Sequence, residues 1–463
     1  MTHRIAVVGS GYVGTVVAAC FAHLGNAVVA LEVDPLKVAT LSRGTVPFYE
    51  PGLGALLTAA QSSRRLRFTD SYADAIENSD VVFICVGTPP RDDGKPDLTY
   101  IRSVAQSLAL TIQHHHVLVN KSTVPVGTGR WLSEELAKRL RPELFSVVSN
   151  PEFLREGKAV HDFLHPARVI MGSEDKDALA VLADMYGPIL EQRLSGLSEG
   201  QHRVPLLQTS TTTAELAKYA SNAFLATKIS FVNEIARLCD LVGADVTEVA
   251  HAMGLDSRIG DQFLEAGLGW GGSCLGKDIM ALISTASEHG YRPRILEATL
   301  GVNRDQAGLA VHRLADEFGP LKGARVAVFG LTFKAGTDDL RDSPAVEVCR
   351  HLLLAGAVVS AFDPLVKSLP QLPSIYIASS PYDAAEGADA IVLATDWAEF
   401  SDLDLTRLRL VMQGVLFLDG RNRFDPVRAV AAGFRYLGIG RQWPGLESVN
   451  GDAGYDEFEQ GAD

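Results

Sequence analysis

The fold is decided by residues 4–14, which read RIAVVGSGYVG. The apolar run 4–8 predicts a strand that ends at Gly9, a helical pattern over 12–23 follows, and a second apolar run occupies 27–31. Unbroken apolar strands joined through a helix are typical of parallel sheets buried on both faces. Further runs of this kind extend the predicted sheet at 80–86, 117–120 and 146–149. The stretch therefore opens a doubly wound α/β domain.

The glycines of this turn indicate a bound dinucleotide. Gly9, Gly11 and Gly14 form the pattern G-x-G-x-x-G, which allows a tight turn, the approach of a pyrophosphate and close packing of helix on strand. Glu32 ends the second strand 18 residues after Gly14, where a carboxylate bonds the ribose hydroxyls of NAD and repels the 2′-phosphate of NADP. The alternative is a glycine-rich turn that binds nothing. We expect NAD.

Long helices separate this sheet from a second one. Residues 212–215 read as a capping box, and the helix they start is predicted to run to Leu241 with Gly243 as its stop. The α/β pattern then resumes, with runs at 325–330, 358–364 and 389–395 that echo the first sheet. The glycine fingerprint is missing after Gly330, so we expect the second sheet to bind something other than a dinucleotide.

We therefore predict an α/β protein with two doubly wound, Rossmann-like parallel-sheet domains joined by a helical central domain with a long spine helix. The predicted segments are an NAD-binding domain 1–208, a helical domain 209–318, a second sheet domain 319–445 and an acidic tail 446–463, which we expect to be disordered.

Composition narrows the function further. The chain has 463 residues, 47% of them hydrophobic and 21% charged, with a net charge of −14, which disfavours generic nucleic-acid binding. No apolar run approaches a membrane span, and the interrupted N-terminus is no convincing signal peptide. The five cysteines include no C-x-x-C pair, so neither disulfides nor zinc are indicated. We expect a cytoplasmic protein without a metal.

One cysteine differs from the others. Cys274 lies in a glycine-rich loop, residues 267–278, directly before a predicted helix and close to Lys277. A helix N-terminus and a neighbouring cation both lower a thiol pKa, so we predict a reactive thiolate there. The alternative is a buried, inert thiol, a reading that suits the other four cysteines, which lie in apolar patterns: Cys20, Cys85, Cys239 and Cys349.

Other polar residues have plainer readings from spacing alone. Lys218 and Asn222 share one face of the spine helix, as four-residue spacing dictates, and such a pair is usually solvated. Glu152 and Glu156 follow a strand end, where they indicate either a ligand loop or an ordinary turn before a helix. The three consecutive histidines 114–116 cannot all face one ion on a regular element, so we expect a solvated loop.

Taken in order from Ile5 to about Gly440, these motifs resemble the nucleotide-sugar 6-dehydrogenase family. The segments that carry the resemblance are 9–14, 49–53, 86–89, 121–125, 150–157, 222–224, 271–278, 333–334 and 419–422. Glu32 stands where the family more often has aspartate, a departure that keeps the carboxylate on a longer arm.

The resemblance implies an NAD-dependent four-electron oxidation of UDP-glucose to UDP-glucuronate that releases two NADH, in a homodimer or higher homo-oligomer joined through the spine helices. Cys274 would form a thiohemiacetal and then a thioester with the sugar. GDP-mannose and dTDP-glucose remain alternative substrates. A simple two-electron dehydrogenase and a binding protein without turnover remain alternative functions; neither needs Cys274 as a nucleophile.

The resemblance also implies roles for individual residues. Lys218 would stabilise negative charge on the reacting oxygen, and Asp278 would help to activate the hydrolytic water. The catalytic set is Cys274, Lys218, Asn222, Asp278, Glu152 and Thr123. The NAD set is Gly9, Gly11, Tyr12, Val13, Gly14, Glu32, Lys37, Thr88, Thr123, Glu156, Lys277 and Arg341. The substrate set is Glu152, Phe153, Leu154, Arg155, Glu156, Lys218, Asn222, Arg258, Phe263, Leu264, Glu265, Ala266, Gly267, Gly271, Lys334 and Arg421.

Overall fold

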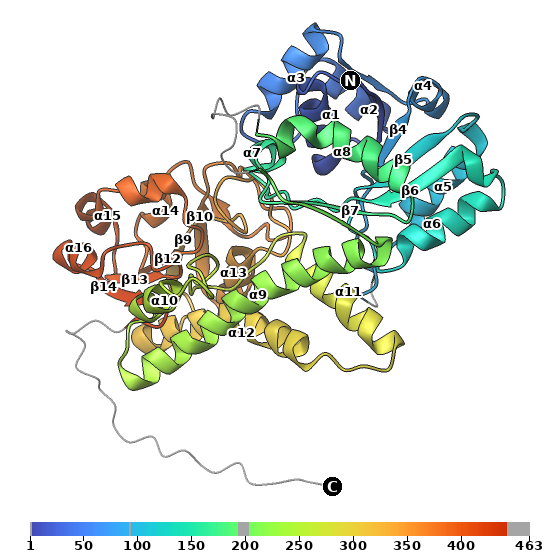
Figure 1. Cartoon of the computed structure of the whole chain (residues 1–463). Coiled ribbons are helices and arrows are strands. Elements are labelled where there is room, and N and C mark those ends of the chain that lie inside the picture. The colour runs from blue at the N-terminus through green and yellow to red at the C-terminus, as the bar shows by residue number, and fades with distance from the viewer. Residues whose placement is uncertain (1, 92–93, 193–202, 442–463) are drawn as a thin grey trace.

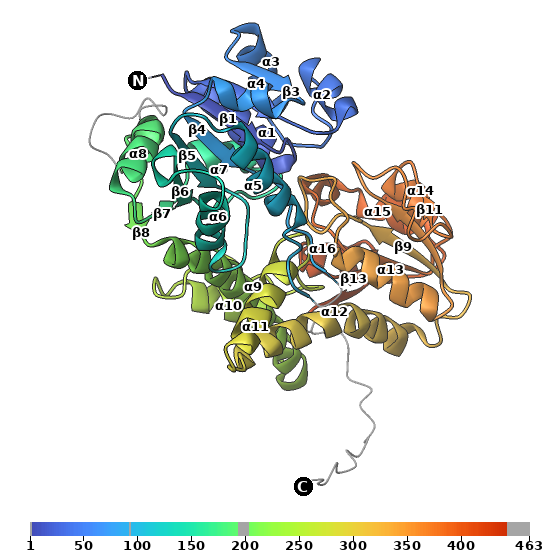
Figure 2. The ribbon, with the colours of Figure 1, turned by 90° about the vertical axis from the view of Figure 1, so that its right-hand side faces the viewer.

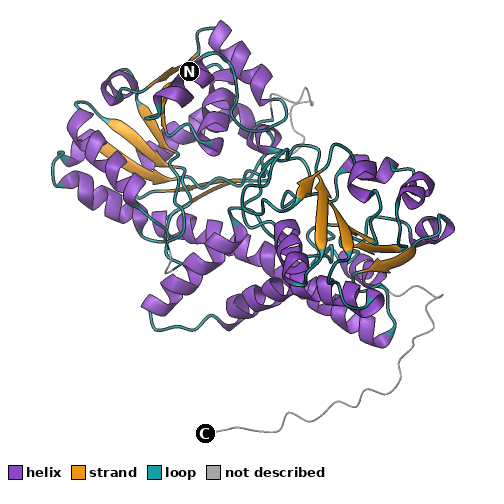
Figure 3. Ribbon diagram, turned by 180° about the vertical axis from the view of Figure 1, so that it is seen from behind, coloured by secondary structure: helices purple, strands orange, loops and turns teal. Residues whose placement is uncertain are grey.

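Two sheets lie in separate lobes, and long helices run beneath both of them (Figure 1). The computed structural model describes residues 2–91, 94–192 and 203–441. The acidic tail predicted from residue 446 onward lies outside this range. Figure 3 shows the strands as two groups that are surrounded by helices. The α/β class and the two-sheet architecture predicted from the sequence are confirmed.

The N-terminal sheet has eight strands in the order β3-β2-β1-β4-β5-β6-β7-β8. Its first six strands follow the dinucleotide-binding order, and their pairs are parallel. The strands are β1 (Arg4–Val8), β2 (Ala27–Leu31), β3 (Leu66–Thr69), β4 (Val81–Ile84), β5 (His116–Asn120), β6 (Phe145–Ser149), β7 (Val169–Gly172) and β8 (Leu206–Thr209). Beyond the predicted strands the sheet contains one reversal: β6 and β7 pair antiparallel, through Ser149 and Gly172. An apolar run does not reveal the direction of its strand.

Helices cover both faces of this sheet (Figure 2). They are α1 (Tyr12–His23), α2 (Pro35–Ser42), α3 (Leu53–Ser62), α4 (Tyr72–Glu77), α5 (Thr99–Thr111), α6 (Thr128–Ala137), α7 (Ala159–Leu164) and α8 (Lys176–Leu190), with a 3₁₀ turn η1 (Pro142–Leu144). Phe21 of α1 is fully buried, and its ring packs against the rings of Phe83, Phe163 and Tyr186. These aromatic contacts fix α1, and with it the glycine turn, on the sheet.

The central helices are α9 (Thr211–Val242), α10 (Val246–Gly254), α11 (Leu275–Glu288) and α12 (Arg294–Phe318). Gly243 ends α9 in the left-handed conformation, as predicted. The predicted capping box is wrong, because Ser210 caps the helix through the Thr213 amide, and the Glu215 carboxylate instead accepts from the amides of Gly127 and Gly129. Across the described residues, no helix combines the length and the apolar character that a membrane crossing requires.

The C-terminal sheet repeats the dinucleotide-binding strand order as β11-β10-β9-β12-β13-β14, with every pair parallel. Its strands are β9 (Arg325–Phe329), β10 (Val358–Phe362), β11 (Tyr376–Ile377), β12 (Ala390–Leu393), β13 (Leu416–Asp419) and β14 (Arg435–Gly438). Its helices are α13 (Pro344–Leu354), α14 (Pro381–Ala385), α15 (Leu405–Val411) and α16 (Pro426–Ala431), with the 3₁₀ turn η2 (Ala398–Asp402). The predicted second doubly wound sheet is confirmed.

The solvated loop that we expected is confirmed for His114 and His115, which are exposed and precede the strand, but it is wrong for His116. His116 begins β5 and is fully buried, and its ring bonds the carbonyls of His114 and Ile76. The ring of His114 bonds the carbonyl of Ser79, and the ring of His115 bonds the Ser146 hydroxyl. The distant partners of these rings lie on α4 (Ile76), in the turn after α4 (Ser79) and on β6 (Ser146), and the spacing of the histidines could not indicate them.

Candidate active site

The glycine turn between β1 and α1 fits a dinucleotide. Gly9 has φ +95°, and a Cβ on Gly14 would lie 1.8 Å from the Gly9 carbonyl oxygen, so neither position admits a side chain. Nothing lies within 4 Å of the corresponding position at Gly11, which leaves open space before the backbone. No side chain caps the start of α1 at Gly11. Its amides therefore face an open cradle suited to a pyrophosphate.

Other predicted NAD residues lie on helices α1 and α2 or just after neighbouring strands. Glu32 follows β2, is buried, and accepts a bond from the Asp34 amide (3.2 Å). Thr88 donates to the carbonyl of Thr123 (2.7 Å), which joins the loops after β4 and β5. Lys37 is exposed on α2 and Val13 is half-buried on α1. The strand order brings these segments to one edge of the sheet, as expected for a nucleotide crevice.

Tyr12 uses its side chain within the protein. Its hydroxyl donates to the carboxylate of Glu50 and accepts from the amide of Gly157 (2.9 Å). Burial and the Glu50 charge raise the pKa of Tyr12, so the phenol stays protonated. The structure therefore ties the glycine turn to the loop that carries Glu156.

In the second lobe, a side chain occupies the position that corresponds to this cradle. The carboxylate of Asp363, just after β10, accepts from the amides of Leu331 (2.8 Å) and Thr332 (3.3 Å) and from the indole of Trp397 (3.1 Å). These amides follow Gly330, just as the amides at the start of α1 follow Gly9 in the first lobe. A carboxylate that occupies them leaves no amide cradle for a pyrophosphate, which agrees with the missing fingerprint.

A cavity of about 880 Å³ lies between the two lobes and α9. It joins the loop after β6, one face of α9, the cysteine loop and the start of the second lobe. The predicted catalytic and substrate residues that line it are Glu152, Phe153, Leu154, Arg155, Glu156, Lys218, Asn222, Phe263, Gly271, Cys274 and Lys334. The structure therefore unites segments that are up to 182 residues apart in the sequence.

Lys218 and Glu152 form the charged centre of this wall. The Lys218 ammonium lies 3.2 Å from the Glu152 carboxylate, and both side chains are more than nine-tenths buried. Burial lowers the pKa of Lys218, but the negative charges of Glu152, Cys274 and Asp278 outweigh it and raise the pKa above its ordinary value. Lys218 therefore remains a cation inside the cavity. The reading of Lys218 and Asn222 as solvated surface is wrong, because both are buried.

Asp278 contacts Asn222 but is not part of the cavity lining. It is fully buried, accepts a bond from the Asn222 amide nitrogen (2.7 Å) and forms an ion pair with Lys277 (2.6 Å). Both of its carboxylate oxygens are thus engaged, and it does not line the large cavity. This geometry suits a residue that orients Asn222.

Cys274 reaches the cavity, but its predicted low pKa is wrong. Desolvation in the cleft raises the pKa of the thiol and the Glu152 charge raises it further, while Lys218 lowers it. Lys277, the cation that the sequence places nearby, instead pairs with Asp278. The four other cysteines are buried, in agreement with their reading as inert thiols.

Glu156 lies where the two lobes meet. Its carboxylate is 3.4 Å from the side chains of Arg341, Ser273 and Thr337. A Cβ on the next residue, Gly157, would lie 2.2 Å from the carbonyl oxygen of Gly336 in the second lobe. Burial raises the pKa of Glu156 to about 7, and Asp339 adds to this rise. The loop of Glu156 and Gly157 thus packs closely against the second lobe, and the Glu156 carboxylate at this contact titrates near neutral pH.

Some predicted substrate residues do not line the cavity. Arg258 is exposed and pairs with Asp256 (2.6 Å). Arg421 is turned inward, toward the carbonyls of Ala394 (2.8 Å) and Gly269 (3.4 Å). Thr123 lines a separate small cavity that also includes Lys218. The members of the 263–267 segment that stay off the cavity wall are Leu264, Glu265, Ala266 and Gly267.

The sequence did not single out several basic residues of the cavity. Arg168 stacks on the Phe153 ring at 3.8 Å and donates to the Ser221 hydroxyl (3.3 Å). Lys121 donates to Asn150 (3.0 Å), and burial lowers its pKa to about 8. The lining holds seven lysines and arginines against four acids, the reverse of the whole chain. The available signal for Lys121 was its place directly after a strand; Arg168 precedes one and carries no such signal.

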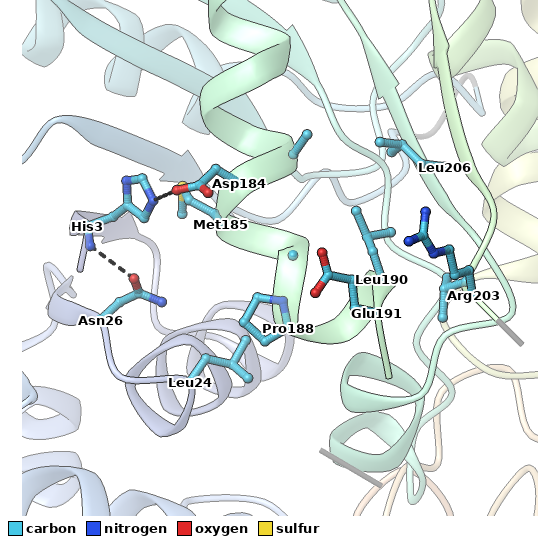
Figure 4. A pocket seen from close by; sticks show the side chains of 13 residues that line it. His3, Leu24, Asn26, Asp184, Met185, Pro188, Leu190, Glu191, Arg203 and Leu206 are labelled. Carbon is cyan, nitrogen blue, oxygen red and sulfur yellow. Dashed lines mark hydrogen bonds and ion pairs between the residues drawn. The ribbon is translucent and has the colours of Figure 1, made fainter. Parts of the chain in front are cut away.

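A second cavity, of about 400 Å³, lies at the other end of the N-terminal lobe (Figure 4). Its wall includes His3, whose ring lies 2.9 Å from Asp184, together with Asn26 and Arg203. It contains none of the predicted site residues, so we assign it no role in the chemistry.

Fold and site together define the class of the protein, an NAD-dependent oxidoreductase with two Rossmann-like lobes. Three family models match the chain in order: the NAD binding domain of the UDP-glucose/GDP-mannose dehydrogenase family at residues 3–190, its central domain at 212–305 and its UDP binding domain at 327–426. The chain belongs to the UDP-glucose/GDP-mannose dehydrogenase family. The resemblance drawn from the sequence and the NAD prediction are confirmed.

Relatives agree along the whole length. UDP-glucose 6-dehydrogenases of Rhizobium meliloti and Pseudomonas aeruginosa are each 44% identical and align over 95% of this chain and 99% and 97% of their own. A UDP-glucose dehydrogenase structure from Pyrobaculum islandicum, 39% identical, superposes with a TM-score of 0.87 over 96% of this chain and 98% of its own. A UDP-D-ManNAc dehydrogenase structure from Pyrococcus horikoshii gives 0.81 at 28% identity over 95% and 99%.

Proposed function

We propose that this chain is a UDP-glucose 6-dehydrogenase that oxidises UDP-glucose to UDP-glucuronate. The observation that carries the proposal is the meeting of Cys274, Lys218 and Asn222 on one cavity wall next to the NAD lobe. A two-electron dehydrogenase has no use for a thiol there. Relatives with 44% identity that bear this name support the choice.

The first oxidation converts the C6 alcohol to an aldehyde. When bound at the glycine turn, NAD would supply the hydride acceptor, and a second NAD molecule would replace the first NADH before the second oxidation, so one sugar would yield two NADH. The Lys218 ammonium stabilises negative charge on the C6 oxygen, and Glu152, at 3.2 Å, keeps that ammonium in place. The alcohol proton leaves through a water or carboxylate of this wall.

Covalent catalysis follows. The Cys274 sulfur adds to the aldehyde carbon, and the proton of the thiol passes to the former carbonyl oxygen. The new C–S bond turns an aldehyde that has no easily donated hydride into a thiohemiacetal that has one. Loss of this second hydride leaves a thioester. Water then adds to the thioester carbon, the C–S bond breaks, and Cys274 departs as a thiolate while uronate is released.

Neighbouring residues position these groups. Asp278 accepts from the Asn222 nitrogen and so leaves the Asn222 carbonyl oxygen for a hydroxyl of the substrate. Thr123 and Glu152 are our candidates for holding the hydrolytic water, with Asp278 acting through Asn222. We propose the predicted NAD set, from Gly9 to Arg341, as the residues that contact the cofactor.

The cavity charge supports a nucleotide diphosphate as the handle of the substrate. Lys334 from the second lobe and Arg168 from the first face the cavity, and desolvation lowers the pKa of both. A phosphate next to these cations would offset the cost of desolvating them. The UDP binding domain of the family lies in the same lobe as Lys334. dTDP-glucose and GDP-mannose remain the alternatives to be tested.

We also propose a homodimer joined through α9. Phe224, Phe231 and Leu238 recur every seven residues on this helix, and all three are exposed. A heptad stripe of this kind buries its apolar area against a similar helix. A second copy of the chain offers such a helix with the same stripe. A cytoplasmic location suits the proposal, because Cys274 must stay a free thiol.

The experiment that tests the proposal measures NADH released per sugar consumed, with UDP-glucose, dTDP-glucose and GDP-mannose in parallel. We expect two NADH per sugar and the highest kcat/KM with UDP-glucose. One NADH per sugar would contradict the thioester route, and turnover of GDP-mannose alone would contradict the choice of substrate.

A further inference from the structure

Glu215 is a buried carboxylate one helical turn before Lys218. It is 3% exposed, and it accepts from the amides of Gly127 (2.6 Å) and Gly129 (2.7 Å) and from the hydroxyl of Ser149 (3.1 Å). Gly127 is the N-cap of α6, so the carboxylate occupies the start of that helix, where a negative charge is favoured. Among the described residues, no lysine or arginine donates a hydrogen bond to it.

Helices α6 and α9 approach each other closely at this carboxylate. A Cβ on Gly129 would lie 2.3 Å from the Thr211 side chain and 3.1 Å from a Glu215 carboxylate oxygen, so only glycine lets α6 come this close to α9. Burial raises the pKa of Glu215, while the amides of Gly129 and Gly127 lower it. A buried carboxylate is stabilised only while its hydrogen-bond donors stay within reach. Any shift of α6 relative to α9 would therefore weaken the hydrogen bonds of Glu215.

Glu215 joins three segments that carry the reacting side chains. The segment that ends at Gly127 follows β5 and includes Thr123. Ser149 ends β6 just before the loop of Glu152. Glu215 itself lies on α9, on the same face as Lys218, and Glu215, Thr123 and Lys218 line one small cavity.

We propose that Glu215 is a positioning residue, which fixes the loop of Thr123 and the end of β6 against α9 so that Thr123 and Glu152 face Lys218 in register. The inference rests on the proposed function. Glu215 would not touch the substrate. Its effect on the reaction arises because an error of about 1 Å in the placement of reacting groups costs on the order of a hundredfold in rate.

Glu215→Gln tests this role with little change in shape. The amide has one acceptor oxygen for two backbone donors, and its NH₂ group must face N–H groups. We expect kcat with UDP-glucose and NAD to fall by about tenfold to a hundredfold, while the Kd for UDP-glucose changes by less than about threefold. Glu134→Gln, an exposed position on α6, is the matched control and should leave both quantities unchanged.

A double-mutant cycle separates positioning from a general structural role. If Glu215 acts through the loop of Thr123, Glu215→Gln should cost about twofold or less in a Thr123→Ala background. Equal losses in both backgrounds, or a variant that loses thermal stability while kcat is unchanged, would overturn the inference.

Ser149→Ala keeps the test open if Glu215→Gln does not fold. It removes one donor of three, so we expect kcat to fall by about twofold to fivefold and Thr123→Ala to cancel the loss. Unchanged kcat in Ser149→Ala would then overturn the inference. The wild-type arm tests the proposed function separately: absence of UDP-glucose oxidation there defeats both claims, whereas wild-type turnover with an unaffected Glu215→Gln variant defeats only this one.

Discussion

The ammonium group of Lys218 and the carboxylate of Glu152 face each other at 3.2 Å, with side chains 5% and 7% exposed. The two residues come from the spine helix and from the loop after β6, so only the assembled fold makes the pair. Replacing either residue by a neutral one would leave the charge of the other buried and uncompensated, which strongly destabilises the folded protein. Both charges also act on the nearby thiol, because Glu152 raises the pKa of Cys274 and Lys218 lowers it.

Replacing Cys274 tests the covalent route. Cys274→Ala should nearly abolish uronate formation, because no nucleophile remains to form the thioester. The overall fold and the Kd for NAD should be unchanged, as measured by circular dichroism and calorimetry. Cys349→Ala, in the buried core of the second lobe, is the control and should retain activity. A normal uronate yield from Cys274→Ala would contradict the mechanism.

The raised pKa of Cys274 predicts slow alkylation at neutral pH. The rate constant for iodoacetamide should rise by about tenfold per pH unit up to pH 9 or beyond, because only the thiolate reacts. Glu152 raises the pKa of this thiol and Lys218 lowers it. At pH 7.5, Glu152→Gln should therefore react faster than the wild type and Lys218→Met more slowly. The reverse order would contradict the charge assignment, and Cys274→Ala supplies the background rate.

Glu156 predicts a pH-dependent stability. Its pKa of about 7 lies above the ordinary value, so the folded protein binds a proton more readily than the unfolded chain between those values. The Glu156 contribution to stability therefore falls as pH rises to 7. Glu156→Gln mimics the protonated form and should raise the Tm relative to wild type more at pH 8.5 than at pH 5.5. The exposed Glu134→Gln should show no such difference, and a uniform Tm change in Glu156→Gln would count against the shift.

Glu32 predicts cofactor choice. Glu32→Gln should weaken NAD binding by about tenfold, the loss expected for a hydrogen bond to a charged group. It should also improve the Kd for NADP, because repulsion of the 2′-phosphate disappears. Calorimetric titration of both cofactors measures this, with the exposed Glu77→Gln as control. Equal losses for both cofactors would show that Glu32 does not face the ribose.

The stripe on α9 predicts the oligomeric state. The wild-type chain should sediment as a dimer or higher oligomer at micromolar concentration, and Phe231→Asp should shift it toward monomer, because a charge would interrupt the apolar contact. Leu410→Asp, on α15 and 79% exposed, is the control and should not change the mass. A monomeric wild type, or a Phe231→Asp variant of unchanged mass, would contradict the proposed interface.

Local sequence determined the secondary structure near the cofactor closely. The helix expected at 12–23 is α1 (Tyr12–His23), and the strands expected at 4–8 and 27–31 are β1 and β2. Apolar periodicity and glycine requirements are properties of short stretches, so they can be read without knowledge of the rest of the chain. The family motifs added the identity of Cys274, which lies on the cavity wall.

Tertiary structure decided what each polar group does. The sequence offered Glu215 a capping role at its own helix end, but Gly127, Gly129 and Ser149, more than sixty residues away, supply better donors. Likewise, Lys277 appeared to be the cation of Cys274 but pairs with Asp278. Hydrogen bonds and charges act through space at a few ångströms, whereas the sequence orders residues only along the chain. The sequence by itself thus determined the two sheets, the dinucleotide turn and the candidate nucleophile; the packing of the lobes on α9 decided which charges surround that nucleophile.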